Sequence, residues 1–573
     1  MNKKNQFKPM LFSNMKQYSF GQFGKDLIAG IIVAIIALPL SIALAIASGV
    51  QPQCGIYTAV AAGLLISFLG GSRVQIAGPT AAFATIVAGI VAKNGIDANG
   101  EFNYEMGFEA LKIATIMAGI ILVLMGVFKL GSLIKFIPYT ITTGFTAGIA
   151  ITLFVGQVKD FLGLSYAPGT ENIETVDKVK NIFTFSSTFN YQALIVGCVS
   201  LAILVFWPMI PKIGQKVPAS LLAVIAGVAM IKLLHWDSVK TIADIAEGGA
   251  DALKGLPDLS FPTITFAKIR AVVGDAFTIA ILAAIESLLS CVVSDSMINS
   301  HHRPNQELVA QGVGNVGSAM FGGIPATGAI ARTAANIKNG GRTPIAGIVH
   351  AITLFIVLMF LMPYAALIPM PTIAAILFQV AYNMSGWRTF AHLVKTSPKS
   401  DILVLVTTFV LTVAFDLVVA IAVGMVLACV LLMKRMADES SVKGWQYYDP
   451  ENDPDSIELK NVPKDVRVYE ISGPMFFGAA DRIAEITIKD FTKVLIIRMR
   501  AVPALDATAM HSLEQLFEKC KENNVQIVFS HVNEQPMKTM TKSGFIKMVG
   551  EDNFCGHIDD ALKRAEEICK AEK

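Results

Sequence analysis

The sequence predicts a polytopic α-helical membrane protein that carries a small α/β domain at its C-terminal end. Of its 573 residues, 53% are hydrophobic and only 16% are charged, whereas soluble proteins carry about 25% charged residues. The charges are sparse from residue 25 to 436 and dense from 437 to 573. We therefore divide the chain into a cytoplasmic N-terminal segment 1–24, a transmembrane domain 25–436 and a soluble domain 437–573.

Apolar runs set the number of expected membrane spans. A hydrocarbon core about 30 Å thick needs about 20 apolar residues per helix. Runs of this kind occur near residues 27–48, 55–70, 109–131, 137–158, 192–210, 217–235, 271–297, 305–321, 343–363, 370–386, 401–415 and 417–434, with two shorter ones near 79–93 and 328–339. We expect about fourteen segments in total.

The loop charges predict the orientation of the spans. Lys and Arg collect in cytoplasmic loops. With the N-terminus inside, the inner loops carry Arg73, Lys129, Arg303, Lys338, Arg342, Arg388, Lys395 and Lys434. The outer stretch 97–105 is acidic, and Lys268 and Arg270 are the exception. The sequence therefore predicts a multi-pass protein of the inner or plasma membrane with both termini cytoplasmic. Its seven cysteines, which show no disulfide or metal spacing, agree with a reducing compartment.

The two short segments resemble each other. Each follows a Gly-Gly pair: Gly70-Gly71 precedes the first, and Gly322-Gly323 precedes the second. This similarity indicates two halves of about seven spans each. Because each half has an odd number of spans, the two halves must have opposite orientations in the membrane. Paired Gly/Pro-interrupted segments point to a transporter binding site. The alternative is that Gly and Pro are simply common in membrane helices.

The interrupted segments predict an anion site. Pro79 suits the first turn of a helix, and such a helix start presents free N–H groups with a partial positive charge. If the halves are inverted, the helix starts near Thr80 and Ala329 face each other at the midplane. Two facing N-termini, with the Thr80 hydroxyl as a further donor, favour an anion.

Two ionisable side chains lie at membrane depth near this site. Arg332 is one turn into the second short helix, and Glu286 is in the apolar run 278–293. Intramembrane charges are functional candidates. Burial disfavours the charged form of a carboxylate, so Glu286 is a candidate for proton uptake and release. The alternative is an ion pair between Arg332 and Glu286. Ser290 lies four residues after Glu286, on the same helix face.

Pro39 interrupts the first predicted span. A proline inside a helix kinks it and frees a carbonyl group. Leu40 and Leu44, which follow the kink, are candidates for an apolar wall of the site. The alternative is that they are ordinary leucines that face lipid or protein.

These segments resemble the sulfate permease (SulP) family of anion transporters. The resemblance rests on Ala37-Leu38-Pro39, Ile76-Ala77-Gly78-Pro79-Thr80, Gln311-Gly312-Val313-Gly314-Asn315 and Asn339-Gly340-Gly341-Arg342-Thr343, and it covers nearly the whole chain. It implies a seven-plus-seven inverted repeat with core and gate domains, an elevator-like mechanism and a homodimer. The implied substrate-binding residues are Ala77, Gly78, Thr80, Ala81, Ala329, Ile330, Ala331, Arg332, Leu40 and Leu44.

The resemblance also implies a coupling site at Glu286 and Ser290. Sodium-coupled members often carry Asp where this chain has Glu286, whereas members regarded as proton-coupled carry Glu. Proton symport is therefore favoured, and sodium is the alternative. Where some members have Ser before the arginine, this chain has Ala331, which leaves backbone N–H groups and Arg332 to hold the anion. Sulfate, bicarbonate and C4-dicarboxylates are all substrates within the family.

The sequence of the C-terminal domain predicts alternating strands and helices. Strands are expected at 466–472, 493–499 and 525–532, and helices at 506–521 and 557–569. The domain resembles the STAS domain of SulP proteins. Its turn Leu505-Asp506-Ala507-Thr508-Ala509 matches the family's Asp-x-Ser/Thr-Gly loop, except that Ala509 replaces Gly. Asp506 is a candidate N-cap, and Thr508 occupies the phosphorylatable position of the related antagonists.

The sequence also limits the classes of function. It has no Walker A sequence, nucleophile elbow or metal cluster, so we expect neither an enzyme nor a cofactor. The net charge of +3 gives no reason to expect nucleic acid as a partner. The expected partners are a small anion, the lipid bilayer, a second copy of the chain and a cytoplasmic protein at the STAS domain. A STAS-regulated channel or sensor is the second class of function. A nucleobase carrier of similar fold is a third possibility, but the related nucleobase permeases lack a STAS domain, so the C-terminal domain argues against it.

Overall fold

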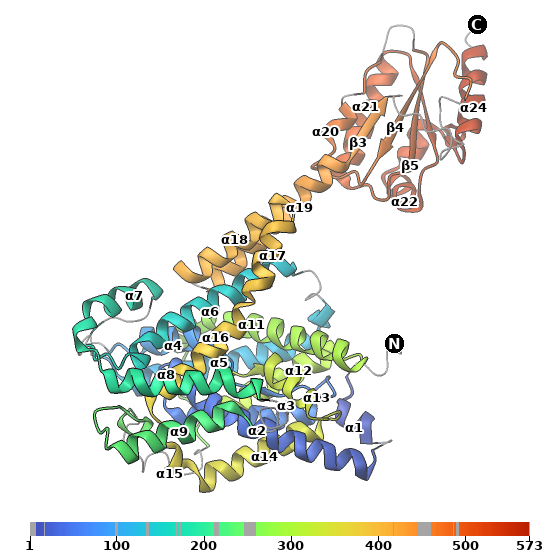
Figure 1. Ribbon diagram of the computed structural model, residues 1–573. Helices are drawn as coiled ribbons and strands as arrows, with labels where there is room; N and C mark the ends of the chain where they lie inside the picture. The colour runs from blue at the N-terminus through green and yellow to red at the C-terminus, as the bar shows by residue number, and fades with distance from the viewer. Residues whose placement is uncertain are drawn as a thin grey trace. The chain divides into compact units, whose positions relative to one another are not determined.

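The computed structural model describes residues 7–571 except for 16–17, 98–100, 133–136, 168–169, 171–173, 211–216, 246–258, 416, 445–459, 485 and 489–491. The chain forms two compact units, Met1–Met425 and Val426–Lys573. Figure 1 shows the first as a bundle of helices and the second as a small sheet with helices.

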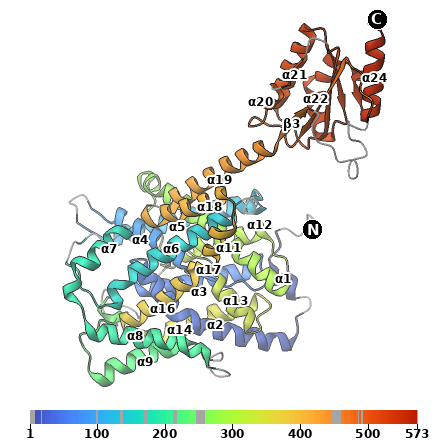
Figure 2. The ribbon, with the colours of Figure 1, turned by 45° about the horizontal axis from the view of Figure 1, so that its top comes forward.

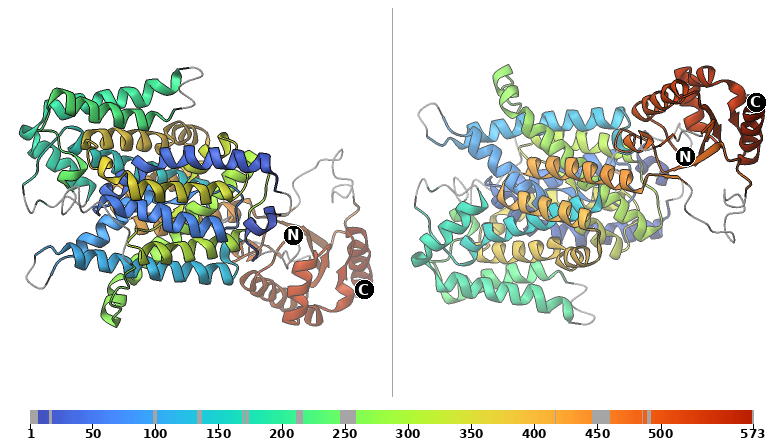
Figure 3. Two further views of the ribbon diagram at one scale, coloured as in Figure 1. Left: turned by 90° about the horizontal axis from the view of Figure 1, so that it is seen from below. Right: turned by 90° about the horizontal axis from the view of Figure 1, so that it is seen from above.

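The first unit is helical. Within the described residues its helices are α1 (Met10–Asn14), α2 (Phe20–Ala47), α3 (Pro52–Leu69), α4 (Ala81–Asn94), α5 (Tyr104–Val127), α6 (Tyr139–Phe161), α7 (Thr175–Thr184), α8 (Tyr191–Phe206), α9 (Ala219–Leu234), α11 (Phe266–Ile298), α12 (Pro304–Met320), α13 (Ile330–Lys338), α14 (Ile345–Phe360), α15 (Met362–Ala365), α16 (Met370–Ser385), α17 (Trp387–Thr396), α18 (Lys399–Ala414) and the start of α19 (Leu417–Glu439). Every predicted span coincides with one of these helices. The long helices run side by side in Figure 3.

Seven helices of the described chain are long and apolar enough to cross a membrane, and three shorter ones are also apolar. The sequence did not predict α1, α7 and α17. These helices have 5, 10 and 10 residues, too few to cross a bilayer, so a search for spans misses them.

The helices of the first unit pack as two groups. One group, called the core group below, consists of α2, α3, α4, α5, α11, α12, α13 and α14; the other, called the gate group, consists of α6, α8, α9, α16 and α18. The most extensive pairings, such as α5 with α12 and α6 with α16, lie within one group. Figure 2 shows α8 beside α9, a gate-group pair.

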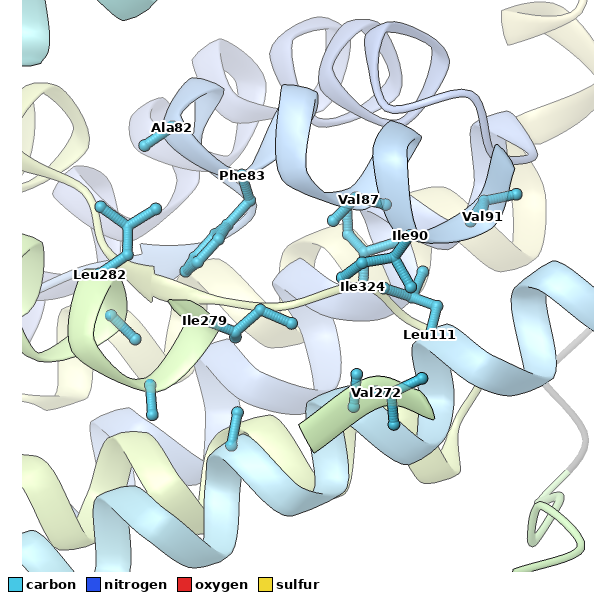
Figure 4. Close-up of a cluster of buried hydrophobic side chains, with 14 of the residues drawn as sticks. Ala82, Phe83, Val87, Ile90, Val91, Leu111, Val272, Ile279, Leu282 and Ile324 are labelled. Atoms are coloured by element: carbon cyan, nitrogen blue, oxygen red, sulfur yellow. The ribbon is translucent and has the colours of Figure 1, made fainter. Parts of the chain in front are cut away.

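The interior of the core group is apolar around α4. Figure 4 shows Phe83 and Val87 of α4 beside Ile279 and Leu282 of α11. All four side chains are buried. This packing fixes α4, and therefore its first turn, against the rest of the core group, because tightly packed interiors resist small displacements.

The seam between the two groups is also apolar. Leu44 of α2 and Ala81 of α4 belong to one buried cluster with Ile373 and Leu377 of α16. Among the described residues, no recorded hydrogen bond joins a core-group helix to a gate-group helix. Within the part of the chain that the structure describes, apolar contacts therefore hold the two groups together.

The second unit contains a five-stranded sheet in the order β3-β4-β5-β6-β7. The strands are β3 (Ser441–Gly444), β4 (Val466–Ser472), β5 (Val494–Ala501), β6 (Gln526–Ser530) and β7 (Phe554–Cys555). β3 is antiparallel to β4, and the other neighbours are parallel.

Helices complete this α/β domain. They are α20 (Asp481–Ala484), α21 (Ala507–Glu522), α22 (Glu534–Ser543), α23 (Phe545–Val549) and α24 (Ile558–Ala571). Two apolar clusters are built on the sheet, one with α21 and one with α24. The predicted strands and helices are confirmed, whereas β3, β7, α20, α22 and α23, all short or polar, were not predicted.

Candidate functional site

The two interrupted segments meet as a small antiparallel ribbon. β1 (Ala77–Gly78) pairs with β2 (Thr327–Gly328), with Ala77 opposite Gly328 and Gly78 opposite Thr327. The Ala329 N–H extends the pairing by donating to the Ile76 carbonyl at 2.9 Å. α4 begins just after β1, and α13 begins just after β2. Because the strands are antiparallel, the two helices leave the ribbon in opposite directions with both N-termini towards it.

Both helix starts present backbone N–H groups without acceptors. Within the described residues, no hydrogen bond is recorded for the N–H groups of Ala81 and Ala82 in α4, or of Ile330, Ala331 and Arg332 in α13. Free N–H groups at helix starts carry a partial positive charge. Ala81 is buried, Thr80 and Ala329 are half-buried, and Ile330 and Ala331 are exposed. The ribbon therefore brings the predicted backbone donors together.

The Arg332 side chain turns back beneath the ribbon. It is 2% exposed, and its Nη2 donates to the Pro79 carbonyl at 3.1 Å and to Ser41 Oγ at 3.3 Å. Nε and Nη1 are buried without a hydrogen-bond partner. A buried cation without a counter-charge is costly, so this guanidinium favours a negative charge nearby.

Gly78 is required by this arrangement. A Cβ atom at Gly78 would come within 2.3 Å of Arg332 Nη1. The ribbon and the guanidinium therefore pass each other only because residue 78 has no side chain.

Glu286 lies on the other side of the ribbon and contacts Thr80. The Thr80 hydroxyl donates to Glu286 Oε2 at 2.9 Å. No ion pair between Glu286 and Arg332 is recorded, although both residues are described. The ion-pair alternative is therefore wrong.

Ser290 and the two leucines surround the site in different ways. Ser290 is buried, and its hydroxyl points to Thr333 Oγ1 at 3.5 Å, which in turn accepts from the Ile76 N–H at 3.1 Å. Ser290 therefore contacts the first turn of α13 and, through Thr333, the ribbon. Leu44 is buried in the apolar seam, and the half-buried Leu40 packs against the same cluster.

The buried carboxylate of Glu307 fixes the segment that precedes β1. The sequence analysis did not identify this residue. Glu307 of α12 is 0% exposed. Its Oε2 accepts from the N–H groups of Gly71 and Ser72 at 2.8 and 3.1 Å. Its Oε1 accepts from Gln75 Nε2 at 2.9 Å and from two further side chains. These bonds satisfy the carboxylate without a cation and fix the extended chain that leads into the ribbon.

The site holds no evident metal centre. Within the described ranges, no group of three or more His, Cys, Asp or Glu side chains is placed to bind a metal ion. The free donors at the ribbon are backbone N–H groups and the Arg332 guanidinium, which suit an anion. The Thr80 hydroxyl, predicted as a further donor to the anion, instead donates to Glu286.

Comparison with known proteins agrees with this geometry. The sulfate permease family matches residues 23–408, and the STAS domain matches residues 458–563. The chain belongs to the sulfate permease family. It is 38% identical to the putative sulfate transporter YvdB of Bacillus subtilis, over 96% of this chain and 99% of the relative. It is 30% identical to the bicarbonate transporter BicA of Picosynechococcus, over 94% of each.

Solved structures of the family share the fold. The murine solute carrier 26 family member A9, an anion transporter in the inward-facing state, matches 97% of this chain and 94% of its own, with a TM-score of 0.85 at 19% identity. The transmembrane domain of BicA matches 72% of this chain and 98% of its own, with a TM-score of 0.61 at 28% identity. The SulP and STAS assignments are thus confirmed, and so is the fold class of a helical membrane domain with an α/β STAS domain. The seven-plus-seven repeat stays a prediction. This is a membrane-embedded anion transporter, and family members are transporters rather than enzymes.

The STAS turn is organised by Asp506. Its Oδ1 accepts from the Ala509 N–H at 2.8 Å, and its Oδ2 accepts from the Phe477 N–H at 2.9 Å. Asp506 is therefore the N-cap of α21, as predicted. Thr508 lies on the exposed first turn of α21, which leaves its hydroxyl accessible. A regulatory role for this pair stays a prediction.

Replacing Asp506 by alanine should loosen the first turn of α21. Loss of an N-cap costs about 1 kcal/mol, and the Phe477 N–H also loses its acceptor. In the full-length protein, amide hydrogen exchange of residues 507–510 should become about fivefold faster. Asp506→Asn, which keeps the capping oxygen, is the matched control. Equal exchange in Asp506→Ala and wild type would contradict the capping role.

Proposed function

We propose that this protein is a secondary active transporter that takes up a small anion, namely sulfate, bicarbonate or a C4-dicarboxylate. The observation that carries the proposal is the pair of helix starts at the ribbon, with free N–H groups above and the buried, unpaired Arg332 guanidinium below. This arrangement favours a negative charge from two sides. The proposed binding residues are Ala77, Gly78, Thr80, Ala81, Ala329, Ile330, Ala331 and Arg332, with Leu40 and Leu44 as an apolar wall.

The functions of the relatives narrow the choice of anion. One relative is a putative sulfate transporter, and another is a bicarbonate transporter. Sulfate and bicarbonate are both oxyanions that accept several hydrogen bonds, as the donors at the ribbon require. We therefore rank these two anions ahead of the dicarboxylates.

The mechanism that we propose is an elevator-like movement of the core group along the gate group. The ribbon, Arg332 and Glu286 all belong to the core group, so the whole site would move as one body. The apolar seam, without recorded hydrogen bonds across it in the described residues, supports such sliding. Interconversion of two such packings is a known mode of conformational change.

Proton symport through Glu286 is the proposed coupling. The carboxylate touches the Thr80 hydroxyl and no cation, so its protonation changes the net charge beside the anion. A sodium ion at the same carboxylate is the alternative, in which case the protein would be a sodium-coupled symporter.

We further propose an inner or plasma membrane location with both termini in the cytoplasm, a homodimer and a cytoplasmic partner at the STAS domain. Lys268, one of the two exceptions to the charge rule, pairs with Glu109 at 2.6 Å. The proposed orientation is supported by the Lys and Arg residues of the other loops.

Uptake by proteoliposomes under imposed gradients tests the coupling. We expect labelled sulfate or bicarbonate to accumulate when the outside is acidic, and sodium to have no effect. Accumulation that follows sodium and ignores the pH gradient would replace proton coupling by sodium coupling. Anion currents far above roughly 10³ ions per second, the upper range of typical turnover numbers, would favour the channel alternative.

A further inference from the structure

Helix α17 has a basic face and an apolar face. It runs over the 10 residues Trp387–Thr396. Arg388, His392 and Lys395 share one face, because residues three and four apart are neighbours on a helix. The apolar residues share the opposite face: Trp387, Phe390, Ala391 and Val394. A helix with this division of residues is typical of the surface of a membrane.

The chain keeps α17 next to the ends of two gate-group helices. One residue, Gly386, separates it from α16, and Ser397 and Pro398 separate it from α18. Gly386 has a φ of +52°, a left-handed conformation that ends α16 and turns the chain. Ten helical residues rise only about 15 Å, whereas the hydrocarbon core is about 30 Å thick. α17 is therefore too short to cross the bilayer.

Only part of the apolar face packs against protein. The rings of Phe390 and Phe409, which belongs to α18, form an edge-to-face pair with centroids 5.3 Å apart, and α17 also contacts α6. Figure 1 shows α17 beside α18. Trp387 is 51% exposed and Val394 is 37% exposed. In a membrane protein, apolar surface of this kind contacts lipid, and tryptophan favours the level of the headgroups.

The basic face has no counter-charge from the protein. Arg388, Lys395 and Lys399, which begins α18, are exposed. No ion pair is recorded for these three side chains among the described residues, and residues 387–400 include no Asp or Glu. The Arg388 guanidinium lies 5.4 Å from the centre of the Trp387 ring. A cation therefore stands directly beside the aromatic side chain that favours the headgroups.

The corresponding short helix between α6 and α8 differs in charge. This helix, α7, also has 10 residues. Its lysines Lys178 and Lys180 are accompanied by Glu174 and Asp177. A purely basic face is therefore not a general property of the short helices that connect gate-group helices, and it indicates a negatively charged surface next to α17.

We propose that α17 lies in the headgroup region of the cytoplasmic leaflet and binds anionic phospholipids through Arg388, Lys395 and Lys399. Lipid phosphate groups supply the counter-charge that the protein lacks, and the exposed apolar residues reach the acyl chains. Because α17 is joined to α16 and α18, bound lipid holds the gate group at a fixed depth while the core group moves. This inference rests on the proposed orientation and transport function.

Quenching of Trp387 fluorescence by brominated lipids tests the lipid contact. The chain has four tryptophans, and replacing the other three by phenylalanine leaves Trp387 as the only reporter in the full-length protein. We expect dibrominated phosphatidylglycerol to quench at lower mole fractions than dibrominated phosphatidylcholine. This preference should fall about fivefold for each cation replaced by glutamine, and about 100-fold when Arg388, Lys395 and Lys399 are all replaced.

Two controls accompany the quenching measurement. Replacing Lys521, Lys542 and Lys547 by glutamine removes the same charge from exposed positions of the STAS domain and should leave the preference unchanged. Soluble glycerol phosphate should not compete, because it lacks acyl chains. An unchanged preference in the triple variant of α17, or full competition by glycerol phosphate, would overturn the inference.

Uptake separates this inference from the proposed transport function. In phosphatidylcholine vesicles, added phosphatidylglycerol should speed sulfate or bicarbonate uptake severalfold for wild type and for the STAS control, but not for the triple variant of α17. The anionic vesicles repel the substrate equally in all three cases. An equal gain in all three proteins would overturn the role of α17 in holding the gate group. The expected lipid preference without uptake of any anion by wild type would overturn the transport proposal and leave the lipid contact in place.

Discussion

Arg332→Ala is expected to reduce anion uptake by roughly 100-fold or more, because truncating a buried, hydrogen-bonded charge costs about 2–5 kcal/mol. The guanidinium is buried beneath the ribbon and donates to the Pro79 carbonyl. Its loss removes the positive charge next to the helix starts and leaves that carbonyl without its donor. The measurement is initial uptake of labelled sulfate and bicarbonate into proteoliposomes with equal amounts of protein.

Two further variants show whether the effect is electrostatic. Ser41→Ala removes only the 3.3 Å contact with Arg332 and should lower uptake severalfold at most, since one such bond contributes about 1 kcal/mol. Gly78→Ala should resemble Arg332→Ala, because the added Cβ would displace the guanidinium. Size-exclusion profiles identical to wild type confirm folding of each variant. Wild-type uptake by folded Arg332→Ala would contradict a role for this charge.

Glu286→Gln is expected to uncouple uptake from the pH gradient. Glutamine retains the shape of glutamate and an oxygen that accepts from Thr80, but it does not exchange a proton. Anion binding and anion exchange across the membrane should therefore continue. Accumulation driven by an acidic outside should fall about tenfold or more, because a pH difference of one unit, which is a tenfold proton gradient, no longer drives uptake.

The readout is a comparison of gradient-driven uptake with counterflow of labelled anion in the same proteoliposomes. Glu286→Asp, which keeps a titratable carboxyl group, is the control and should retain part of the pH response. Equal pH-driven accumulation by Glu286→Gln and wild type would show that the coupling proton binds elsewhere.

Much of this architecture could be predicted from local sequence. Apolar length identified the spans, since each membrane helix must satisfy its own backbone hydrogen bonds and present apolar side chains. The Gly-rich entries and Pro79 identified the two short helices, because extended backbone at membrane depth needs protein or a cavity around it. The Asp506 cap could also be predicted, because its partner, Ala509, is only three residues away in the sequence.

Features that depend on distant partners could not be predicted in this way. The Glu307 carboxylate bonds Gln75, which is 232 residues away in the sequence, and no local pattern encodes that pairing. The direction of the Arg332 side chain depends on Ser41 and Pro79, which belong to other segments.

Uptake by purified protein is the most direct test of the central claim that an anion binds at the two helix starts of the ribbon. A panel of labelled sulfate, bicarbonate and fumarate is offered to proteoliposomes that contain wild type or Arg332→Ala. The claim predicts saturable uptake of at least one of these anions by wild type and its near-complete loss in the variant. No uptake of any of them by wild type, or equal uptake by both proteins, would contradict it.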